Sequence, residues 1–409
     1  MTLFSQPSRL HRPRMSYWQN RMLRSRIAIL ARNGARKWLF LRRSFASDPF
    51  ILGIETSCDD TGVAILDEHG DICSNIVSSQ WELQAKWKGV VPALAARAHE
   101  TNLPHVIQAA IEQSNMNDVH HLRAIAVTSG PGLSPCLDVG LSMAKQLCLA
   151  HSIPFIKVNH LEAHILVAML PNLCEEIPLF PFLVLLVSGG HCCLVLAKNF
   201  GEYQVLGSTL DDSVGEAFDK VARLLQLSGD KDVMHGGKLV ETMALQGDPS
   251  VFRFTEPMRH RADCDFSYSG IKSAMLRRVQ QLGEPTADQR ADLCAAFQQA
   301  AVNQLVTKTE RACLWGKELL GPSLRHLVVC GGVASNQYLF RRIEVLAETQ
   351  NMIAIVPPAR YCTDNGAMIA FAGLQRYHRG TRDQPVDARY DPRWRLQDLT
   401  PPGFASSHS

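Results

Sequence analysis

The clearest sign of metal chemistry in this sequence is the spacing of two histidines, which lie one helical turn apart. His160 and His164 flank Leu161-Glu162-Ala163, and residues four apart on a helix project from the same face, so both imidazoles can reach one cation. Glu162 lies roughly 200° round the helix from His160 and cannot point at that cation. A zinc protease helix places its glutamate directly after the first histidine, so a protease is disfavoured. Two partly buried histidines that only pack or cap are the alternative.

The chain before the histidine pair begins with a predicted hairpin. Residues 50–55 and 63–66 have the apolar composition of buried strands, and the polar turn 56–62 joins them. Carboxylates in such a turn can bind a phosphate through metal or water, and its hydroxyls can bind directly. Asp-rich turns are also common for conformational reasons alone. Helices are expected at about 91–114 and 137–151.

The second half repeats this order of elements. Residues 182–187 and 192–196 are predicted strands joined by Ser188-Gly189-Gly190-His191. A later strand, 327–330, leads through glycines into a helix, as 124–127 does in the first half. Strand, glycine-rich turn and helix is the arrangement that aims backbone N–H groups at an anion. We therefore expect an α/β protein with two similar mixed lobes facing each other across a nucleotide cleft.

The basic charge of the chain is concentrated at its N-terminus. Residues 1–47 contain ten Arg and one Lys without any Asp or Glu, so the remaining 31 basic residues stand against all 39 acidic ones, and the body carries about −8 with His neutral. Such an arginine-rich, acid-free leader is typical of a mitochondrial transit peptide. A basic arm that binds nucleic acid is the alternative. We therefore expect the protein in the mitochondrial matrix.

Length and apolar patterning limit the class of protein further. The 409 residues leave room for two or three domains. The 12 Cys include no Cys-x-x-Cys pair and lie mostly in apolar runs, which favours buried thiols in a reducing compartment. No stretch reaches the roughly 18 to 20 apolar residues of a membrane span. The polar sequence from about Gly380 predicts a loosely held end of the chain.

One segment interleaves basic and aromatic side chains. Phe252-Arg253-Phe254 and Arg259-His260-Arg261 precede Phe266, Tyr268 and Lys272. Such a mixture can stack on the bases and neutralise the phosphates of single-stranded nucleic acid. An ordinary amphipathic surface is the alternative. The segment is a candidate RNA contact.

Six stretches appear in an order that resembles one family. They are Ile51–Asp59, His160–His164, Leu186–His191, Gly215–Lys220, Cys330–Asn336 and Cys362–Gly366. Together they resemble the tRNA threonylcarbamoyladenosine transferases of the bacterial TsaD type and its mitochondrial counterpart, once labelled O-sialoglycoprotein endopeptidases. The resemblance covers about residues 50–375. It implies an actin/Hsp70/sugar-kinase-like fold of two lobes.

The resemblance also implies a reaction. The threonylcarbamoyl group passes from threonylcarbamoyl-AMP to N6 of the adenosine beside the anticodon, position 37, in tRNAs that read ANN codons, and AMP leaves. We accordingly expect a transit peptide (1–47), a first lobe (48–178 with 365–395), a second lobe (179–364) and a loose tail (396–409).

Particular residues receive roles from the same resemblance. It assigns His160, His164 and Asp364 to the metal. It assigns the adenylate to Leu186, Val187, Ser188, Gly189, Gly190, Asp219, Gly237 and Asn336. Two imidazoles and a carboxylate leave coordination positions open, so one divalent ion, either iron, zinc or manganese, can polarise a substrate oxygen. For Asp219, an ordinary salt bridge is the alternative.

A base is expected near the carbamoyl carbon, because the exocyclic amine of adenine is a weak nucleophile. Glu55, Asp59 and Asp60 are the candidates, on the hairpin opposite the phosphate loop, and the sequence does not rank them.

Partners and competing functions follow from what the chain contains. It has no separate module for making the activated donor, so a separate synthase must supply threonylcarbamoyl-AMP, and the resemblance implies a homodimer.

An ATP-dependent kinase or ATPase of the same fold class is the first alternative, although neither requires a His-x-x-x-His pair. A non-catalytic RNA-binding protein is the second, and the acidic body disfavours tight non-specific RNA binding.

Overall fold

The computed structural model describes residues 50–87, 89–116, 119–228 and 236–399. These residues all belong to the compact unit that begins at Pro49. The predicted transit peptide, 1–47, and the final residues of the predicted tail, 400–409, lie outside the described residues. None of the helices in the described ranges is long and apolar enough to cross a membrane.

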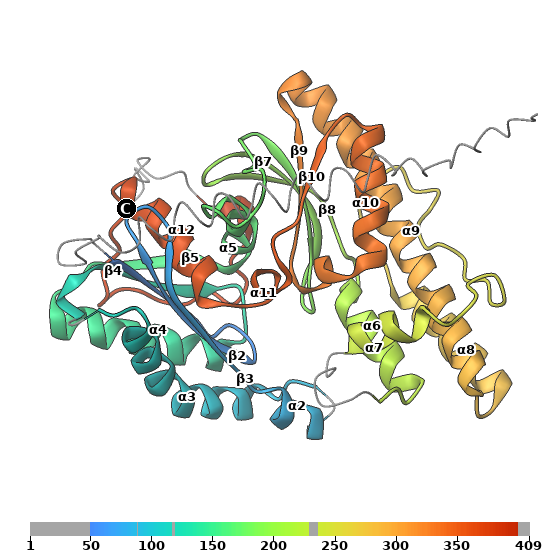
Figure 1. The fold of residues 1–409 in the computed structure, drawn as a ribbon, viewed down its shortest axis with the longest axis horizontal. Coiled ribbons are helices and arrows are strands. Elements are labelled where there is room, and N and C mark those ends of the chain that lie inside the picture. Colours follow the sequence, from blue (N-terminus) through green and yellow to red (C-terminus); the bar gives the residue numbers. More distant parts are fainter. Residues whose placement is uncertain (1–49, 88, 117–118, 229–235, 400–409) are drawn as a thin grey trace, which may run out of the picture. The chain divides into compact units, whose positions relative to one another are not determined.

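The first sheet has five strands in the order β3-β2-β1-β4-β5 (Figure 1). Its strands are β1 (Phe50–Glu55), β2 (Asp60–Asp67), β3 (Ile72–Ser79), β4 (Leu122–Gly130) and β5 (Phe155–Asn159). β1 pairs with β2 antiparallel and with β4 parallel, so the predicted N-terminal hairpin is confirmed. β2 begins at Asp60, which makes the turn shorter than expected.

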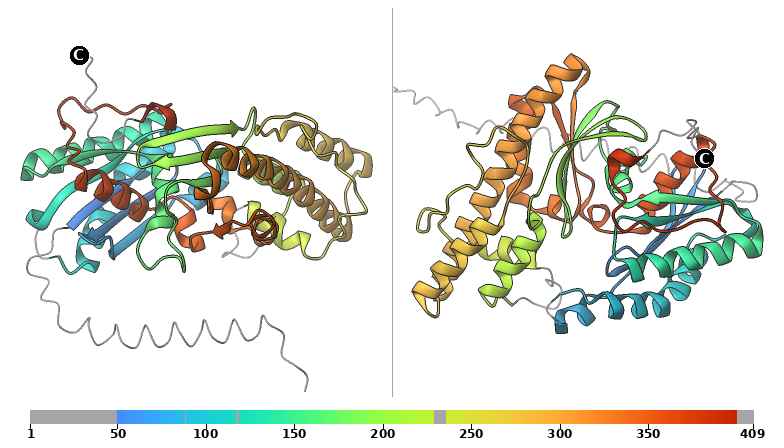
Figure 2. Two further views of the ribbon diagram at one scale, coloured as in Figure 1. Left: turned by 90° about the horizontal axis from the view of Figure 1, so that it is seen from above. Right: turned by 180° about the vertical axis from the view of Figure 1, so that it is seen from behind.

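Helices cover both faces of the first sheet, and we call this assembly the first lobe. They are α2 (Trp81–Trp87), α3 (Pro92–Gln113), α4 (Ser134–His151), α5 (His160–Leu166) and α12 (Gly366–His378). α3 and α4 lie on one face of the sheet and α12 on the other (Figures 1 and 2). In β1, Leu52 and Ile54 face the core shared with α3 and α4, whereas Ile51 faces α12. A Cβ on Gly53 would lie 2.3 Å from the backbone N of Ala370, so only glycine admits α12 this close.

The second sheet reproduces the first strand for strand. Its order is β10-β9-β6-β7-β8, formed by β6 (Phe182–Val187), β7 (Cys192–Asn199), β8 (Glu202–Ser208), β9 (His326–Cys330) and β10 (Ile353–Ile355). β6 takes the place of β1, because it pairs antiparallel with β7 and parallel with β9. The prediction of two similar mixed α/β lobes is confirmed.

The helices of the second lobe lie mainly on one face of its sheet. They are α6 (Val214–Leu224), α7 (Gly236–Ala244), α8 (Ser269–Leu282), α9 (Ala287–Leu320), α10 (Gln337–Thr349) and the short α11 (Ala359–Cys362). Leu183 and Leu185 of β6 pack in the core that contains α6, α7, α9 and α10. Val184 and Leu186 face the other way, toward α5.

α5 therefore lies between the two sheets, and all seven of its residues are buried. Ala163 and Leu166 join the core of the first lobe, while Leu161 and Ile165 join the face of the second sheet. Asn159 starts the helix, because its side chain accepts hydrogen bonds from the N–H groups of Leu161 and Glu162.

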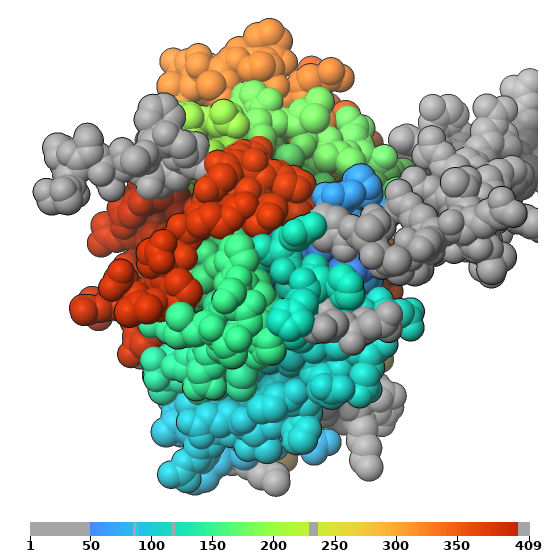
Figure 3. Space-filling view, turned by 90° about the vertical axis from the view of Figure 1, so that its left-hand side faces the viewer, coloured from blue at the N-terminus to red at the C-terminus, as the bar shows by residue number. Residues whose placement is uncertain are grey.

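The expectation of a loose chain end from about Gly380 is wrong for residues 380–399. Asp383 accepts a hydrogen bond from the Lys157 N–H at 2.8 Å, on the edge of β5. Leu396 and Leu399, which belong to the predicted tail 396–409, are buried against the second sheet. Figure 3 shows this segment, in red, crossing the surface of the first lobe beside residues coloured green. Polar sequence misled the prediction, because Asp383 and Asp391 bind the backbone of the first sheet. The lobe boundaries as a whole stay a prediction.

Candidate functional site

The two histidines and the late aspartate come together in one buried cluster. One possible ligand atom from each of His160, His164 and Asp364 lies within 4.8 Å of the others. Asp364 Oδ1 is 3.1 Å from His164 Nε2 and 3.6 Å from His160 Nε2. Both imidazoles are almost fully buried, whereas the Asp364 side chain is 22% exposed. The cluster is therefore accessible from the side of Asp364.

Different elements bring these three residues together. α5 carries both histidines on one face, as the spacing predicted. Asp364 lies between α11 and Asn365, whose side chain caps α12 by accepting from the Met368 N–H. Glu162 points away from the cluster, as expected. It accepts hydrogen bonds from Tyr203 Oη at 3.0 Å and from Arg376 Nη2 at 2.5 Å.

Glu55 fixes the orientation of His160. Its Oε2 lies 3.1 Å from His160 Nδ1 and accepts from Thr128 Oγ1 at 2.5 Å, and its Oε1 accepts from the Ser57 N–H at 2.5 Å. Burial raises the pKa of Glu55, but the charge and hydrogen bond of His160 outweigh it and hold the pKa below its usual value. Burial lowers the pKa of His160, yet Glu55 and then Asp364 raise it to about 9. A carboxylate that holds one ring nitrogen leaves the other free for a metal.

The cluster fits a divalent metal. Two nitrogens and one oxygen are a donor set that suits iron, zinc or manganese, and the three donor atoms lie close to one another. The pKa of Asp364 is held well below its usual value, because the positive charge of His160 and a hydrogen bond from His164 outweigh the effect of burial. His164 Nδ1 is buried and finds no hydrogen-bond partner among the described residues, so this ring is oriented by packing and by Asp364.

The loop between β6 and β7 lies beside this cluster. The ring of His191 is 6.2 Å from the ring of His160, centroid to centroid. Ser188 Oγ accepts from the N–H groups of Gly190 and His191 at 3.3 Å and 3.0 Å. Gly189 and Gly190 are exposed, and a Cβ on either would meet no atom within 4 Å. The loop therefore leaves space for a ligand next to the candidate metal site.

The other predicted adenylate residues fall into three groups. Leu186 and Val187 are fully buried, so only their backbone can meet a ligand. Asp219 Oδ1 accepts from the Gly237 N–H at 3.2 Å, which places these two together. Asn336 caps α10 through its Oδ1 and donates from Nδ2 to Gln298 Oε1 at 2.9 Å. Both ends of this amide therefore have structural partners.

The two remaining carboxylates differ from Glu55. Asp60 is the first residue of β2 and is half-buried. Burial, and then the charge of Asp364, raise the pKa of Asp60 to about 7. Asp59, the last residue of the turn, is also half-buried. The sequence could not rank the three, because their burial depends on how the hairpin packs.

Comparison with known proteins identifies the family. The family model for tRNA N6-adenosine threonylcarbamoyltransferase, TsaD, matches residues 71–371. A probable mitochondrial tRNA N6-adenosine threonylcarbamoyltransferase of Arabidopsis thaliana is 41% identical over 387 residues, covering 90% of this chain and 78% of the plant protein. The tRNA N6-adenosine threonylcarbamoyltransferase of Anaeromyxobacter dehalogenans strain 2CP-C is 44% identical over 347 residues, covering 85% and 99%. The chain belongs to the TsaD family.

Structural similarity extends beyond the TsaD family. HypF of T. kodakarensis superposes with a TM-score of 0.52 at 13% identity, over 82% of this chain and 48% of HypF. The chain thus spans about half the length of HypF, and the likeness shows the fold alone. This likeness agrees with the predicted actin/Hsp70/sugar-kinase-like fold class.

Proposed function

We propose that the protein transfers the threonylcarbamoyl group from threonylcarbamoyl-AMP to N6 of adenosine 37 in mitochondrial tRNAs that read ANN codons, releasing AMP. The observation that carries the proposal is the 6.2 Å between the rings of His160 and His191. This short distance places a candidate metal cluster beside an exposed glycine loop in a member of the TsaD family. The arginine-rich sequence of 1–47 and the mitochondrial plant relative support a location in the mitochondrial matrix.

The loop and the metal ligands have complementary tasks in this reaction. The exposed backbone of Gly189 and Gly190 lets the adenylate phosphate approach closely. His160, His164 and Asp364 would hold one divalent ion, which would supply Lewis-acid polarisation of a substrate oxygen. Asp219 and Gly237, which are joined by a hydrogen bond, are suited to the ribose hydroxyls of the same nucleotide.

The chemical step needs a proton acceptor. As N6 forms its bond to the carbamoyl carbon, the bond from that carbon to the phosphate oxygen breaks, the electron pair leaves with AMP, and N6 loses a proton. Of the three candidate bases, Asp60 fits best, because its pKa of about 7 matches the working pH of a general base. Glu55 is already occupied by Ser57, Thr128 and His160, and Asp59 stays a candidate.

The proposal includes two partners. A separate synthase supplies threonylcarbamoyl-AMP, and the enzyme acts as a homodimer. The metal is iron, zinc or manganese, because two imidazoles and one carboxylate suit each of them.

One incubation tests the proposal. The purified full chain is mixed with threonylcarbamoyl-AMP and unmodified tRNA, and the nucleosides are then analysed. We expect N6-threonylcarbamoyladenosine at position 37 and one AMP per modified tRNA. A parallel incubation with ATP alone should yield no ADP. Release of ADP without any modified nucleoside would instead support a kinase or ATPase.

A further inference from the structure

A long segment without regular structure covers one face of α9 in the second lobe. Residues 245–268 connect α7 to α8 and form no helix or named strand. Loops of this length without secondary structure are uncommon in compact domains and are usually functional. Its end is held firmly against α9. Lys308 Nζ donates to the carbonyl oxygen of Arg261 at 3.1 Å and to that of Asp263 at 3.0 Å.

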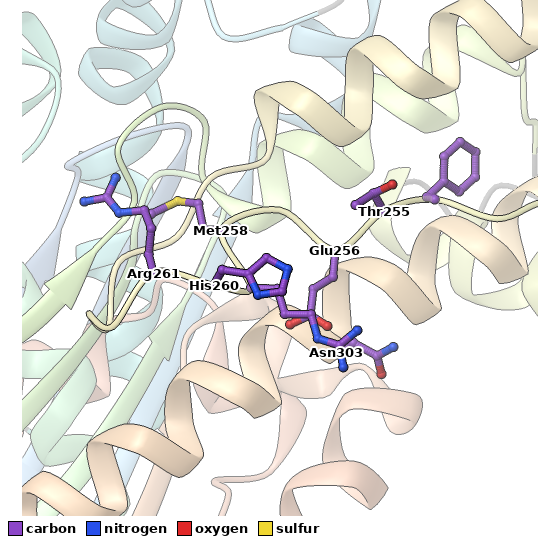
Figure 4. Close-up of a pocket in the computed structure, with 8 residues that line it drawn as sticks. Thr255, Glu256, Met258, His260, Arg261 and Asn303 are labelled. Atoms are coloured by element: carbon purple, nitrogen blue, oxygen red, sulfur yellow. The ribbon is translucent and has the colours of Figure 1, made fainter.

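Two adjoining hollows lie between this segment and α9. Figure 4 draws the residues that line the first of them. Their volumes are about 440 Å³ and about 310 Å³, within the range of pockets that bind small molecules. Phe254, Glu256 and Asn303 line both hollows, so we treat them as one groove. Figure 4 shows Glu256, His260 and Asn303 gathered at one place in it.

The groove is locally basic in an otherwise acidic body. Arg253, Arg259 and His260 line it and are exposed. The guanidinium of Arg278 lies over the ring of Phe252, 5.6 Å from its centroid. Residues 48–409, to which both lobes belong, carry a net charge of about −8 with His neutral. A basic track of this kind attracts a polyanion that the body as a whole repels.

One carboxylate inside the groove lacks a partner. Glu256 Oε1 is buried and has no hydrogen-bond partner among the described residues. Asn303 Oδ1 accepts from Arg342 Nη1 at 2.9 Å, which leaves the Asn303 amide to donate. A buried acceptor without a donor costs free energy, so this site is prepared for a ligand that brings N–H groups. Nucleobases present such groups, whereas an acidic peptide would bring charge of the same sign as Glu256.

We infer that this groove binds an unpaired segment of the tRNA substrate. Its arginines contact phosphates, Phe252 and Phe254 stack on bases, and Glu256 accepts a hydrogen bond from a base N–H. The inference rests on the proposed function for the identity of the RNA.

The segment that forms the groove is bonded to Asp211, and the nearby Ser213 is bonded to the phosphate loop. Just beyond the groove, Asp211 accepts from Ser267 Oγ at 2.6 Å and from the Tyr268 N–H at 2.7 Å. Ser213, two residues after Asp211, donates to the carbonyl oxygen of Gly189 at 2.5 Å. RNA held in the groove is therefore held on the lobe that carries the exposed glycines.

Two variants of the full chain test the groove by tRNA binding. In R253E/R259E, both residues are exposed, so folding should be unaffected. The matched control is R325E/R389E, which makes the same charge change at exposed positions outside the groove. We expect R253E/R259E to weaken tRNA binding at least tenfold at 150 mM salt, to lower the salt slope by about 2, and to raise the KM for tRNA. The control should change each value less than twofold.

The second variant, Glu256→Gln, tests whether Glu256 acts on binding through its negative charge or through a hydrogen bond. Removing a negative charge beside phosphates should tighten binding if Glu256 acts only through charge. We expect about fivefold weaker binding with an unchanged salt slope, because the base N–H then bonds a neutral amide oxygen, which is a weaker acceptor than a carboxylate. Thermal unfolding checks that both variants are folded. Tighter binding by E256Q would overturn the role of Glu256.

Two further outcomes separate the possible failures. If the wild type forms the modified nucleoside and R253E/R259E binds tRNA as tightly as the control, the groove is wrong and the proposed function stands. If the wild type binds tRNA, and R253E/R259E does not, while no product forms, the groove stands and the proposed function fails. A polyglutamate peptide that competes as well as single-stranded RNA of equal charge would show a general anion surface and overturn the inference.

Discussion

The two lobes place equivalent hairpin loops on either side of the candidate site, and the loops differ in their packing. The β1–β2 loop is enclosed: Thr56 and Ser57 are buried, Thr56 Oγ1 donates to the carbonyl of Cys136 at 2.9 Å, and Ser57 O accepts from the Leu133 N–H at 2.8 Å. The β6–β7 loop exposes Gly189 and Gly190 with free space around both.

The difference shows how one topology can serve two tasks. The enclosed loop fixes protein groups, because Glu55 and Ser57 both approach His160 Nδ1. The exposed loop presents two glycines with free space around them and suits a ligand that comes and goes. Rigid support on one side and available space on the other suit the transfer reaction proposed above.

The largest effect should come from the metal ligands. His160→Ala, His164→Ala and Asp364→Asn should each lose most of the bound metal and lower kcat/KM by roughly 10³-fold, because several kcal/mol of charge stabilisation disappear. Metal content by mass spectrometry and single-turnover assays measure both. His105→Ala, an exposed histidine on α3, is the control. Full metal content and activity in any of the three ligand variants would remove the proposed centre.

A general base on the enclosed hairpin should give the next effect. Asp60→Asn should lower the single-turnover rate about 10²-fold. The pKa of Asp60 is raised to about 7, and a base acts when deprotonated, so the wild-type rate should rise with pH to about 7 and then level off. That rise should be absent from Asp60→Asn. If Asp59→Asn loses the rise instead, the assignment moves to Asp59.

Replacement of Glu55 should act on the metal rather than on proton transfer. Glu55→Gln should weaken metal affinity about 10- to 100-fold, because His160 loses the carboxylate that orients it. Excess metal should restore most of the activity, which it cannot do for a lost base. Metal affinity is measured by competition with a chelator. An unchanged affinity with a lasting loss of rate would make Glu55 the base after all.

Sequence patterns were enough to predict the common helix face of the two histidines and the two lobes. His160 and His164 are four residues apart, and this spacing fixes their common face on any helix. Asp364 is 200 residues from His164, so only resemblance to a family could connect them. The strands were predictable because they are continuous apolar runs, as in β6, Phe182–Val187.

The roles of the carboxylates were not predictable from spacing. Glu55 and Asp60 belong to the same hairpin, yet one has a lowered pKa and the other a raised one. His160, which is distant in sequence, lowers the pKa of Glu55, whereas burial and the equally distant Asp364 raise that of Asp60. The prediction of a loose C-terminal segment failed for a similar reason, since Asp383 accepts a hydrogen bond from the distant Lys157 N–H. Local composition says nothing of such long-range bonds.

Alanine substitutions should separate the two loops directly. Gly189→Ala should leave the melting temperature unchanged, since its Cβ meets no atom within 4 Å, and should raise the KM for threonylcarbamoyl-AMP about tenfold by filling the space for phosphate. Gly132→Ala, beside the enclosed loop, should instead lower stability, because its Cβ would lie 2.8 Å from Ser57 O. Gly270→Ala on α8 is the neutral control. An unchanged KM in Gly189→Ala would argue against phosphate at this loop.

The smallest effect should come from Asp211, which accepts hydrogen bonds from residues at the start of α8. Hydrogen bonds from Ser267, Ser269 and the Tyr268 N–H outweigh the effect of burial and hold its pKa below the usual 3.8. The carboxylate therefore contributes stability above about pH 4, and the contribution is lost as pH falls through the lowered pKa. Because the side chain is largely exposed, Asp211→Asn should cost only about 1 kcal/mol at pH 7. Urea unfolding of both proteins should show this gap closing as pH is lowered toward 3, and a gap that is constant with pH would mean that Asp211 acts through packing rather than charge.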